Sequence, residues 1–579
     1  MSRPGNIPTF NREFFESSEN FTTIGEGNIG GKAQGLAFIK NLIEVELGHD
    51  QSDDFILDIP RLTVIATDVF DMFIERNNLV DLRTSKLQDY QIAHEFLQGQ
   101  FPVEFVGDLM ALISSIHTPL AIRSSSLLED SLQHPFAGVY NTKMIPNNQP
   151  DTTTRFHKLV EAIKLVWAST YFAEAQAYIR NTTADPAEEK MAVIIQEVVG
   201  FRHGDRFYPN ISGVARSYNY YRFGDNKPEE GIVNLALGLG KTIVDGGVCW
   251  SYCPAAPQTS TPFGTIKDLL QNTQLKFWSV NMGKPPEYDP IKEAEYLRED
   301  DLSDSEGDQT LALVASTYDA ASDRIQPGIQ MKGPRILNFA PVLTYESIPL
   351  NNWVKKLIHK SREHIGVDVE MEFAITVDPI SRRVRLGFLQ IRPMLYTDEK
   401  INLPQLDDVS AKHLVVSNNV LGNGRIKNVR HIMYVKKDSF DKSKTLHIAK
   451  DIADLNEILR NRIIPYILIG FGRWGSNDRW LGIPVVWSQI SGAQAIVECT
   501  LPEMNIELSQ GSHFFHNLTS FQVPYFSVRH HKNDDFVNWE LLDQQTSILE
   551  TDNMRLIQLD HPVSVLVDGR SGKGIIIYE

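Results

Sequence analysis

The sequence predicts a mixed α/β (α+β) protein, because segments of helical and of strand periodicity alternate along it. Apolar residues recur at helical spacing over residues 155–180, which indicates an amphipathic helix. Residues 191–199 and 232–237 are short apolar runs with strand character, and residues 563–579 are two β-branched runs around a glycine-containing turn, which predicts a hairpin. The apolar residues at helical spacing are Leu159, Ile163, Val166 and Trp167.

The composition is that of a globular protein with several domains. A chain of 579 residues suggests roughly three or four domains. No apolar run approaches the roughly 18 residues that a membrane-spanning helix needs. The first residues also lack the apolar core of a secretion signal, so we expect no contact with a membrane.

Charge and cysteine content narrow the partners and the compartment. The net charge of −17 argues against nucleic acid as a partner, because phosphate binding needs a basic surface. Cys249, Cys253 and Cys499 are too few for a disulfide framework. A zinc site is not expected either, because the sequence has no second pair of metal ligands near Cys249 and Cys253. A reducing cytoplasm is therefore the expected location.

Two polar segments suggest how the chain is divided. Residues 255–310 are rich in Pro, Thr and acidic groups and are expected to form an insertion or a loop, with the acidic cluster at 299–308 in solvent. Residues 396–412 are the best candidate for a linker. The expected organisation is a domain at 1–395, this linker, and a second domain at 413–579.

A hairpin is predicted where the turn sequence DPISRR separates two short strands. Glu370 and Glu372 lie two residues apart on the first strand, so they share one face. The same holds for Gln390 and Arg392 on the second strand. Pairing about Ser381 places Glu372 opposite Gln390, where oxygen ligands suit magnesium and a guanidinium suits a polyphosphate. The alternative is a solvent-facing hairpin with paired charges.

A glycine-rich loop precedes a predicted helix and is a candidate anion site. A loop that enters a helix N-terminus offers unpaired N–H groups, and Lys32 adds a positive charge there. The loop is not a P-loop, because Glu26 and Ala33 stand where that motif needs glycine and Ser or Thr. Residues 240–242 (Gly-Lys-Thr) are not the end of a P-loop either, because Leu235 stands where that motif needs its first glycine. For either loop the alternative is an ordinary tight turn. The glycines of the first loop are Gly25, Gly27, Gly30 and Gly31.

Three motifs, taken in order, resemble the nucleotide-binding domain of the phosphoenolpyruvate synthase and pyruvate phosphate dikinase family. They are GNIGGKAQGLAFI, which contains Lys32, AIRSSSLLEDSLQHPFAGVYNT at 121–142, and GFLQIRPM at 387–394. The resemblance runs through most of residues 20–395. It implies a two-lobed ATP-grasp fold that binds ATP and magnesium.

The resemblance also implies a role for each matching residue. Lys32 and Arg123 match residues that hold the ATP phosphates. Gly138 and Thr142 match the turn that covers the phosphates, and Gln196 matches the segment that borders the adenine. The family's Trp-Gly-Leu-Gly-Glu appears here as Leu-Gly-Leu-Gly-Lys. The hairpin adds the remaining predicted contacts, which are Glu372, Gln390 and Arg392 to the nucleotide and the first two of these to magnesium.

Family members with this ATP domain pass phosphate to a histidine on a swivelling domain, and residues 413–579 resemble a divergent copy of that domain. The segment GSHFFHNLTSFQVPYFSV makes His513 the predicted phosphocarrier, with His516 as the second choice. A neutral imidazole is a good nucleophile toward phosphorus, and a helix N-terminus stabilises the resulting charge. The bulky residues after His513 favour the alternative, a structural histidine in a degenerate domain.

The resemblance implies an ATP-dependent phosphotransferase, a kinase of the dikinase type that passes a phosphoryl group through a histidine to an acceptor. The family's phosphoenolpyruvate/pyruvate barrel is not expected in this chain, so the acceptor would be a small molecule or a separate protein. Two alternatives stay open. One is a regulatory protein that binds ATP and transfers nothing, and the other is one subunit of a split enzyme. A homo-oligomer is compatible with each of them.

Overall fold

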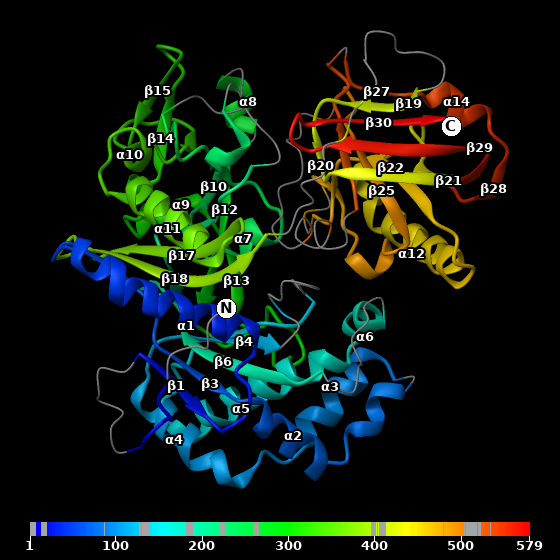
Figure 1. Ribbon diagram of the computed structural model, residues 1–579. Coiled ribbons are helices and arrows are strands. Elements are labelled where there is room, and N and C mark those ends of the chain that lie inside the picture. The colour runs from blue at the N-terminus through cyan, green and yellow to red at the C-terminus, as the bar shows by residue number, and fades with distance from the viewer. Residues whose placement is uncertain are drawn as a thin grey trace.

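The computed structural model arranges the chain in three parts (Figure 1). A first lobe lies at the bottom of the view, a second lobe at the upper left, and the C-terminal part at the upper right. The expected mixed α/β fold class is confirmed. The structure describes residues 7–12, 20–85, 87–126, 129, 139–180, 189–219, 226–258, 266–271, 273–394, 401, 403, 413–476, 478, 480–502, 504, 514, 518, 523–532 and 534–578.

The first lobe is built on a five-stranded sheet whose central strands are buried on both faces. On the strand predicted at 191–199, Val193 and Ile195 join the core of the first lobe, whereas Ala192 and Ile194 join the core of the second lobe. This alternation explains the continuous apolar run, because a strand covered on both faces needs apolar residues at every position. The strands are, in spatial order, β1 (Phe21–Ile24), β3 (Leu62–Ile65), β6 (Met191–Glu197), β4 (Leu120–Ser126) and β5 (Lys143–Ile145).

The helix predicted over residues 155–180 is in fact two helices. The four apolar residues of the pattern lie on α5 (Thr152–Ala168) and are all buried. A 3-10 turn at Ser169–Tyr171 ends this helix, because two hydroxyl groups of the turn donate to carbonyls of its last residues, and α6 (Ala173–Arg180) follows. The other helices of the lobe are α2 (Thr67–Arg76), α3 (Asp89–Gln98) and α4 (Val106–Ser115).

The second lobe is built on a six-stranded sheet that contains both the predicted strand at 232–237 and the predicted hairpin. Helix α1 (Gly30–Leu42) packs against strands of both lobes, β4 and β18, and so lies between them. Helix α11 (Leu350–Ile365) packs on β17 and β9 of the second sheet. The strands are, in spatial order, β11 (Trp250–Tyr252), β10 (Ile232–Ala236), β9 (Ile211–Arg216), β17 (Val369–Val377), β18 (Val384–Pro393) and β2 (Phe55–Asp58).

The described residues of the segment 255–310 do not form a loop. They contain α8 (Ile266–Gln271) and two strands, β12 (Lys276–Asn281) and β13 (Leu297–Asp301), followed by α9 (Leu302–Gly307). The strands extend a four-stranded sheet with β8 (Arg206–Tyr208) and β7 (Phe201–His203). A three-stranded sheet and a short helix follow: β15 (Arg324–Pro327), β14 (Ala315–Asp319), β16 (Arg335–Leu337) and α10 (Ala340–Leu343).

The acidic cluster at 299–308 is paired rather than dispersed in solvent, so the expectation of a solvated loop is wrong. Asp300 is 3% exposed and accepts a hydrogen bond from Ser279 at 2.6 Å. Asp304 and Asp308 form ion pairs with Arg206, at 3.2 Å and 2.7 Å. Their cationic partner lies about a hundred residues away in sequence, on β8, which is why the charge pattern alone pointed to solvent.

The C-terminal part is a second α/β unit built on a ten-stranded sheet. Four neighbouring strands run parallel, and α12 (Thr445–Asn461) connects the first two of them. The predicted C-terminal hairpin is confirmed as β29 paired with β30. The strands are, in spatial order, β20 (Val420–Leu421), β26 (Tyr525–Val528), β25 (Ala493–Cys499), β22 (Tyr466–Phe471), β21 (Gly424–Val435), β29 (Met554–Asp568), β30 (Lys573–Tyr578), β19 (His413–Ser417) and β27 (Phe536–Val537), with β28 (Ser547–Glu550) beside β29.

Within the described ranges, the helices are too short or too polar to cross a membrane. The largest apolar cluster runs from the helices of the first lobe into the sheet of the C-terminal part, so these two parts share buried contacts.

A buried carboxyl group lies just before β6. Glu189 is 3% exposed, and its Oε1 accepts a hydrogen bond from the Tyr140 hydroxyl at 2.6 Å. Its backbone carbonyl accepts from the Arg83 guanidinium at 2.7 Å. Burial raises the pKa of Glu189 to about 7, and the hydrogen bond from Tyr140 offsets part of that effect.

We expect Glu189 to make the free energy of unfolding fall as the pH rises. The folded protein keeps the Glu189 proton up to about pH 7 because the pKa is raised, whereas the unfolded chain releases it near pH ~4.3. The stabilisation is therefore complete below the unfolded pKa and is lost as the pH rises through the folded one. Denaturant unfolding at pH 5 and pH 8 should show the wild type losing on the order of 2 kcal/mol more than Glu189→Gln. If the free energy of unfolding falls by the same amount in the wild type and in Glu189→Gln, Glu189 is not the group responsible.

Candidate functional site

The β17–β18 hairpin presents the predicted ligands, with one irregularity. Glu372 lies opposite Gln390, and Glu370 lies opposite Arg392, as pairing about residue 381 predicts. A β-bulge then shifts the register by one residue and makes Leu389 the extra residue on β18. A bulged residue leaves the regular hydrogen-bond ladder, so the Leu389 carbonyl is available to a side chain.

Arg123 reaches from β4 of the first lobe to this bulge. Its Nη1 donates to the Leu389 carbonyl at 2.7 Å and to Gln196 Oε1 at 3.2 Å. Its Nη2 donates to Gln390 Oε1 at 2.6 Å and lies 3.7 Å from Glu372 Oε2. One guanidinium thus gathers three of the predicted site residues from two lobes, as its planar fork allows.

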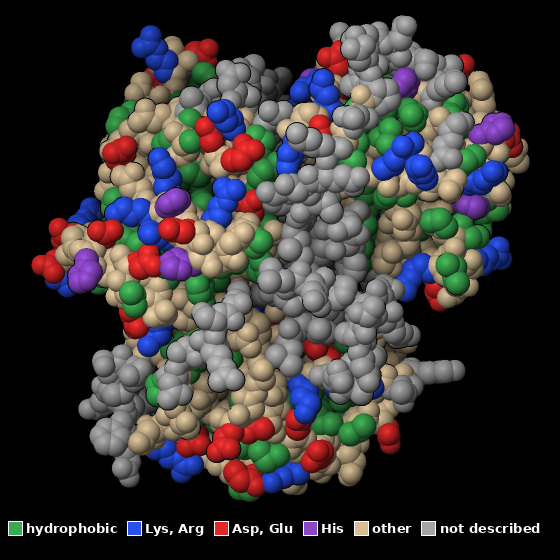
Figure 2. All heavy atoms as spheres, in the orientation of Figure 1, with side chains coloured by type: hydrophobic (Ala, Val, Ile, Leu, Met, Phe, Trp, Pro, Cys, Tyr) green, Lys and Arg blue, Asp and Glu red, His purple; other side chains and the backbone are tan. Residues whose placement is uncertain are grey.

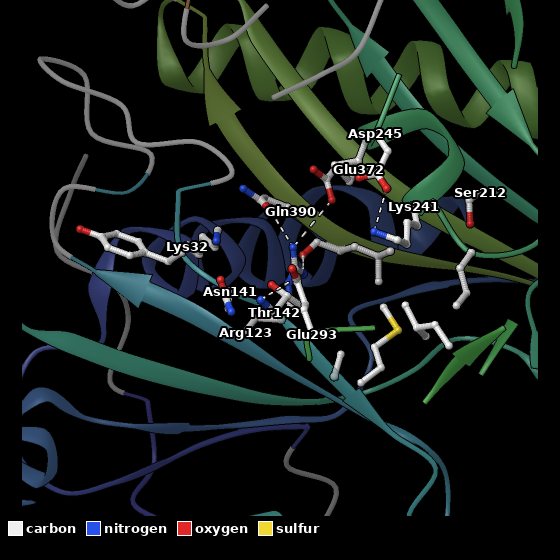
Figure 3. A pocket seen from close by; sticks show the side chains of 18 of the residues that line it. Lys32, Arg123, Asn141, Thr142, Ser212, Lys241, Asp245, Glu293, Glu372 and Gln390 are labelled. Atoms are coloured by element: carbon white, nitrogen blue, oxygen red, sulfur yellow. Dashed lines mark hydrogen bonds and ion pairs between the residues drawn. The ribbon is translucent and has the colours of Figure 1, made fainter. Parts of the chain in front are cut away.

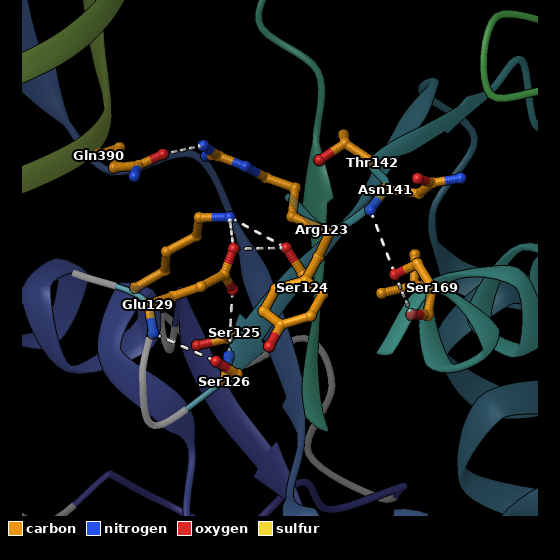
Figure 4. A network of polar contacts seen from close by, with 12 residues as sticks. Arg123, Ser124, Ser125, Ser126, Glu129, Asn141, Thr142, Ser169 and Gln390 are labelled. Carbon is orange, nitrogen blue, oxygen red and sulfur yellow. Dashed lines mark hydrogen bonds and ion pairs between the residues drawn. The ribbon is translucent and has the colours of Figure 1, made fainter. Parts of the chain in front are cut away.

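Lys32, in the first turn of α1, is held beside Arg123 by a carboxylate that the sequence did not single out. Lys32 Nζ lies 2.6 Å from Glu129 Oε1 and 3.0 Å from Ser124 Oγ. Glu129 also accepts from the Ser124 hydroxyl and the Ser126 N–H (Figure 4). In the sequence, Glu129 appears only as an acidic residue shortly after a run of serines. Its contact with Lys32 cannot be predicted from that pattern, because the contact forms only when α1 packs against β4.

Four N–H groups of the glycine-rich loop, which were expected to be open to an anion, donate instead to side-chain oxygens of the protein, as in an ordinary turn. The bonds run from Glu26 and Gly27 to Asp68, from Asn28 to Thr67, and from Gly30 to the Asn28 side chain.

The glycines of that loop serve close packing instead. A Cβ atom at Gly30 would fall 1.7 Å from the Ser125 carbonyl oxygen, and one at Gly31 would fall 1.8 Å from the Glu129 carbonyl oxygen. Gly30 also has a φ of +75°, which favours glycine. Only glycine allows α1 to approach β4 this closely, and this approach places Lys32.

Arg392 and Glu370 form the next cross-strand pair of the hairpin. Arg392 is 2% exposed, and its Nε donates to Glu370 Oε1 at 2.6 Å. The other oxygen of Glu370 accepts from Arg216 Nε at 2.5 Å. Because both oxygens of Glu370 are engaged, Glu372 is the hairpin carboxylate better placed to face a ligand.

A cavity of about 480 Å³ lies between the lobes (Figure 3). Its lining carries Lys32, Arg123 and Arg392 together with Glu372 and Gln390. The apolar residues of the lining, named here the apolar wall, are suited to a planar, uncharged group. Thr142 and Gln196 also line the cavity, and the buried Gln196 amide nitrogen has no hydrogen-bond partner within the part of the chain that the structure describes. The apolar wall includes Ala121, Met144, Val198, Val199, Pro209 and Ala374.

The cavity has a second set of polar side chains, which the sequence analysis did not predict. Lys241 pairs with Asp245 at 2.7 Å, and Glu293 accepts the Thr142 N–H at 2.9 Å. Burial raises the pKa of Glu293, and the bond from Thr142 offsets part of this rise. Lys241 was visible only as part of a failed P-loop pattern, and Glu293 lay in the segment that was expected to be a loop.

The C-terminal part closes the cavity. Arg473 Nη1 donates to the Gly246 carbonyl of the second lobe at 2.9 Å. The 3-10 turn Trp487–Gln489 packs against α6 of the first lobe. The C-terminal part therefore contacts both lobes at the mouth of the cavity. Its lining residues are Gly475, Val485, Val486, Trp487 and Phe514.

Three predicted site residues lie outside the described part of the chain: Gly138, His513 and His516. Phe514, which follows His513 in the sequence, is described and lines the cavity.

The geometry suits a ligand with several phosphate groups and an attached apolar ring. Cations at Lys32, Arg123 and Arg392 can neutralise phosphate oxygens, and the hairpin oxygens of Glu372 and Gln390 are ligands that a hard metal ion prefers. Such an arrangement can stabilise the charge that moves during phosphoryl transfer.

Comparisons with known proteins agree with this description. Residues 26–413 match the family model described as "Pyruvate phosphate dikinase, AMP/ATP-binding domain". A phosphoenolpyruvate synthase of Aeropyrum pernix is 26% identical over 233 residues, which cover 38% of this chain and 26% of the synthase. The chain thus matches about a quarter of the length of that relative. Because the family model covers more than half of the 579 residues, the chain belongs to the pyruvate phosphate dikinase family, of which it carries the AMP/ATP-binding domain.

Proposed function

We propose that the protein is an ATP-dependent phosphotransferase of the dikinase type that binds Mg-ATP between its two lobes. The proposal is carried by one observation, the convergence of Lys32, Arg123 and Arg392 with the oxygens of Glu372 and Gln390 on one cavity. Catalysis at the nucleotide would come from positioning and charge neutralisation. In this reading Thr142 and Gln196 contact the nucleotide directly, and Gly138 belongs to the turn that covers the phosphates.

Glu372 and Gln390 are the residues proposed to hold magnesium. They lie opposite each other on β17 and β18, and both oxygens approach the Arg123 guanidinium, at 3.7 Å and 2.6 Å. Two converging oxygen ligands suit a hard cation, which would take the place that the Arg123 guanidinium holds against them in this structure. When bound, magnesium would neutralise charge on the phosphate oxygens, while Arg123 and Lys32 orient them.

We propose in addition that residues 413–579 form a divergent swivelling domain, joined by a linker at 396–412, and that His513 is the phosphocarrier. An imidazole nitrogen would attack the phosphorus, the bond from phosphorus to the leaving-group oxygen would break, and that oxygen would keep the electron pair. The phosphohistidine would then pass its phosphoryl group to a small molecule or a separate protein. The contacts of Arg473 and Phe514 at the cavity mouth support this assignment.

We predict that Arg123→Ala and Arg392→Ala each weaken ATP binding by ten- to a hundredfold. Each variant removes a charged hydrogen-bond partner of a phosphate, which costs on the order of 1.5–3 kcal/mol. Calorimetric titration with Mg-ATP measures the effect.

Arg385→Ala is the matched control for this titration. Arg385 lies on the same strand as Arg392, but its Nε pairs with Asp58 at 3.0 Å and its side chain is 38% exposed. An exposed pair contributes about 0–1 kcal/mol, so ATP affinity should hardly change. If both Arg123→Ala and Arg392→Ala bind ATP as tightly as the wild type, the nucleotide does not bind at this site.

A second prediction separates transfer from binding. Incubation with ATP labelled at the β-phosphate should leave an acid-labile, base-stable phosphate on the protein, because phosphohistidine has that stability and the family resemblance implies cleavage of ATP to AMP. His513→Ala should abolish the label and leave ATP affinity unchanged, since the two sites belong to different domains. His516→Ala, as the control, should reduce it only modestly.

The possible outcomes of this labelling distinguish the rival functions. If His513→Ala still takes up the label, another residue is the phosphocarrier. A wild type that binds ATP but takes up no label would favour a regulatory protein over a phosphotransferase.

A further inference from the structure

Three charged side chains form a row across three neighbouring strands of the second lobe. Glu370 on β17 lies directly opposite Arg216 on β9 and opposite Arg392 on β18. All three are buried, with exposures of 3%, 8% and 2% in that order. Arg392 lines the cavity, whereas Glu370 and Arg216 do not, although they share its face of the sheet.

The carboxylate of Glu370 is divided between the two guanidinium groups. Oε1 accepts from Arg392 Nε at 2.6 Å, and Oε2 accepts from Arg216 Nε at 2.5 Å. Without Arg216, more of the negative charge of Glu370 would act on Arg392. With Arg216 present, part of that negative charge is compensated by a second guanidinium, which does not line the cavity.

Arg216 is not fully used as a structural hydrogen-bond donor. Its Nη1 has one long contact, 3.4 Å to Asn234 Oδ1, and its buried Nη2 has no partner within the described residues. Burying a guanidinium with unsatisfied donors costs free energy. An apolar side chain on β9 would fill the same position without that cost, so the charge itself needs an explanation.

We propose that Arg216 is a positioning residue that offsets the charge of Glu370 and so leaves the positive charge of Arg392 to act on a phosphate in the cavity. This inference rests on the proposed ATP site. Removing Arg216 takes one positive charge from the neighbourhood of Arg392, and neutralising Glu370 restores the net charge there. Two guanidinium groups on one carboxylate lie within ~10 Å of each other, where such a change is strongly felt in a buried site.

The test is a double-mutant cycle on the full-length protein, with Arg216→Met, Glu370→Gln and both substitutions together. Binding of Mg-ATP and of adenosine, which lacks phosphate, is measured by calorimetry. We expect Arg216→Met to weaken ATP binding about tenfold or more and to leave adenosine binding unchanged. The double variant should recover ATP affinity to within about threefold of the wild type, because the net charge of the two residues next to Arg392 is then the same as in the wild type.

Arg216→Lys is a second variant, which keeps the charge but loses the planar fork. Electrostatic compensation predicts ATP affinity close to that of the wild type, whereas a role in holding the strands together predicts a loss. It also keeps the proposal testable if Arg216→Met does not fold.

Four results would overturn the proposal. They are normal ATP binding by Arg216→Met, ATP binding by the double variant that is no tighter than by Arg216→Met, an equal loss of adenosine and ATP binding in Arg216→Met, and weak ATP binding by Arg216→Lys. Failure of the proposed function is distinguishable, because a wild type that does not bind ATP overturns both, whereas normal ATP binding in Arg216→Met overturns only the role of Arg216.

Discussion

Arg123 crosses from the sheet of the first lobe to the hairpin of the second, and the rest of the site is arranged around its charge. Its side chain is 12% exposed, so the loss of hydration must be compensated by acceptors at short range. The Leu389 carbonyl, Gln390 and Gln196 supply them. The bulge at Leu389 is what frees a backbone carbonyl for this purpose. The two lobes are thus joined at the same point where the ligand oxygens converge.

The part of the site that follows short-range rules could be predicted from the sequence. The two-residue spacing of Glu370 and Glu372 fixes their common face, whereas the residues of β18 that oppose them depend on the turn and on the bulge at Leu389 together. The bulge could not be foreseen, because it is recognised by the shift in register and by the Arg123 contact, which joins residues more than 260 positions apart. The strand at 191–199, which is β6, was also predicted, because its short apolar run has strand character.

The predictions that failed did so because a partner was distant in sequence. The glycine-rich loop was expected to hold an anion, yet Asp68 and Thr67 take its N–H groups. The acidic cluster around Asp304 was expected in solvent, yet Arg206 neutralises it. Glu129, Lys241 and Glu293 were missed for the same reason, since each acquires its position only when separate elements pack together.

The most direct test of the central claim is a crystal structure with a non-hydrolysable ATP analogue and Mn²⁺, which substitutes for magnesium and is located by anomalous scattering. The account predicts one strong anomalous peak within coordination distance of Glu372 and Gln390, with the phosphates beside Lys32 and Arg123 and the adenine against the apolar wall. A nucleotide bound elsewhere, or a metal ion ligated by neither Glu372 nor Gln390, would contradict it.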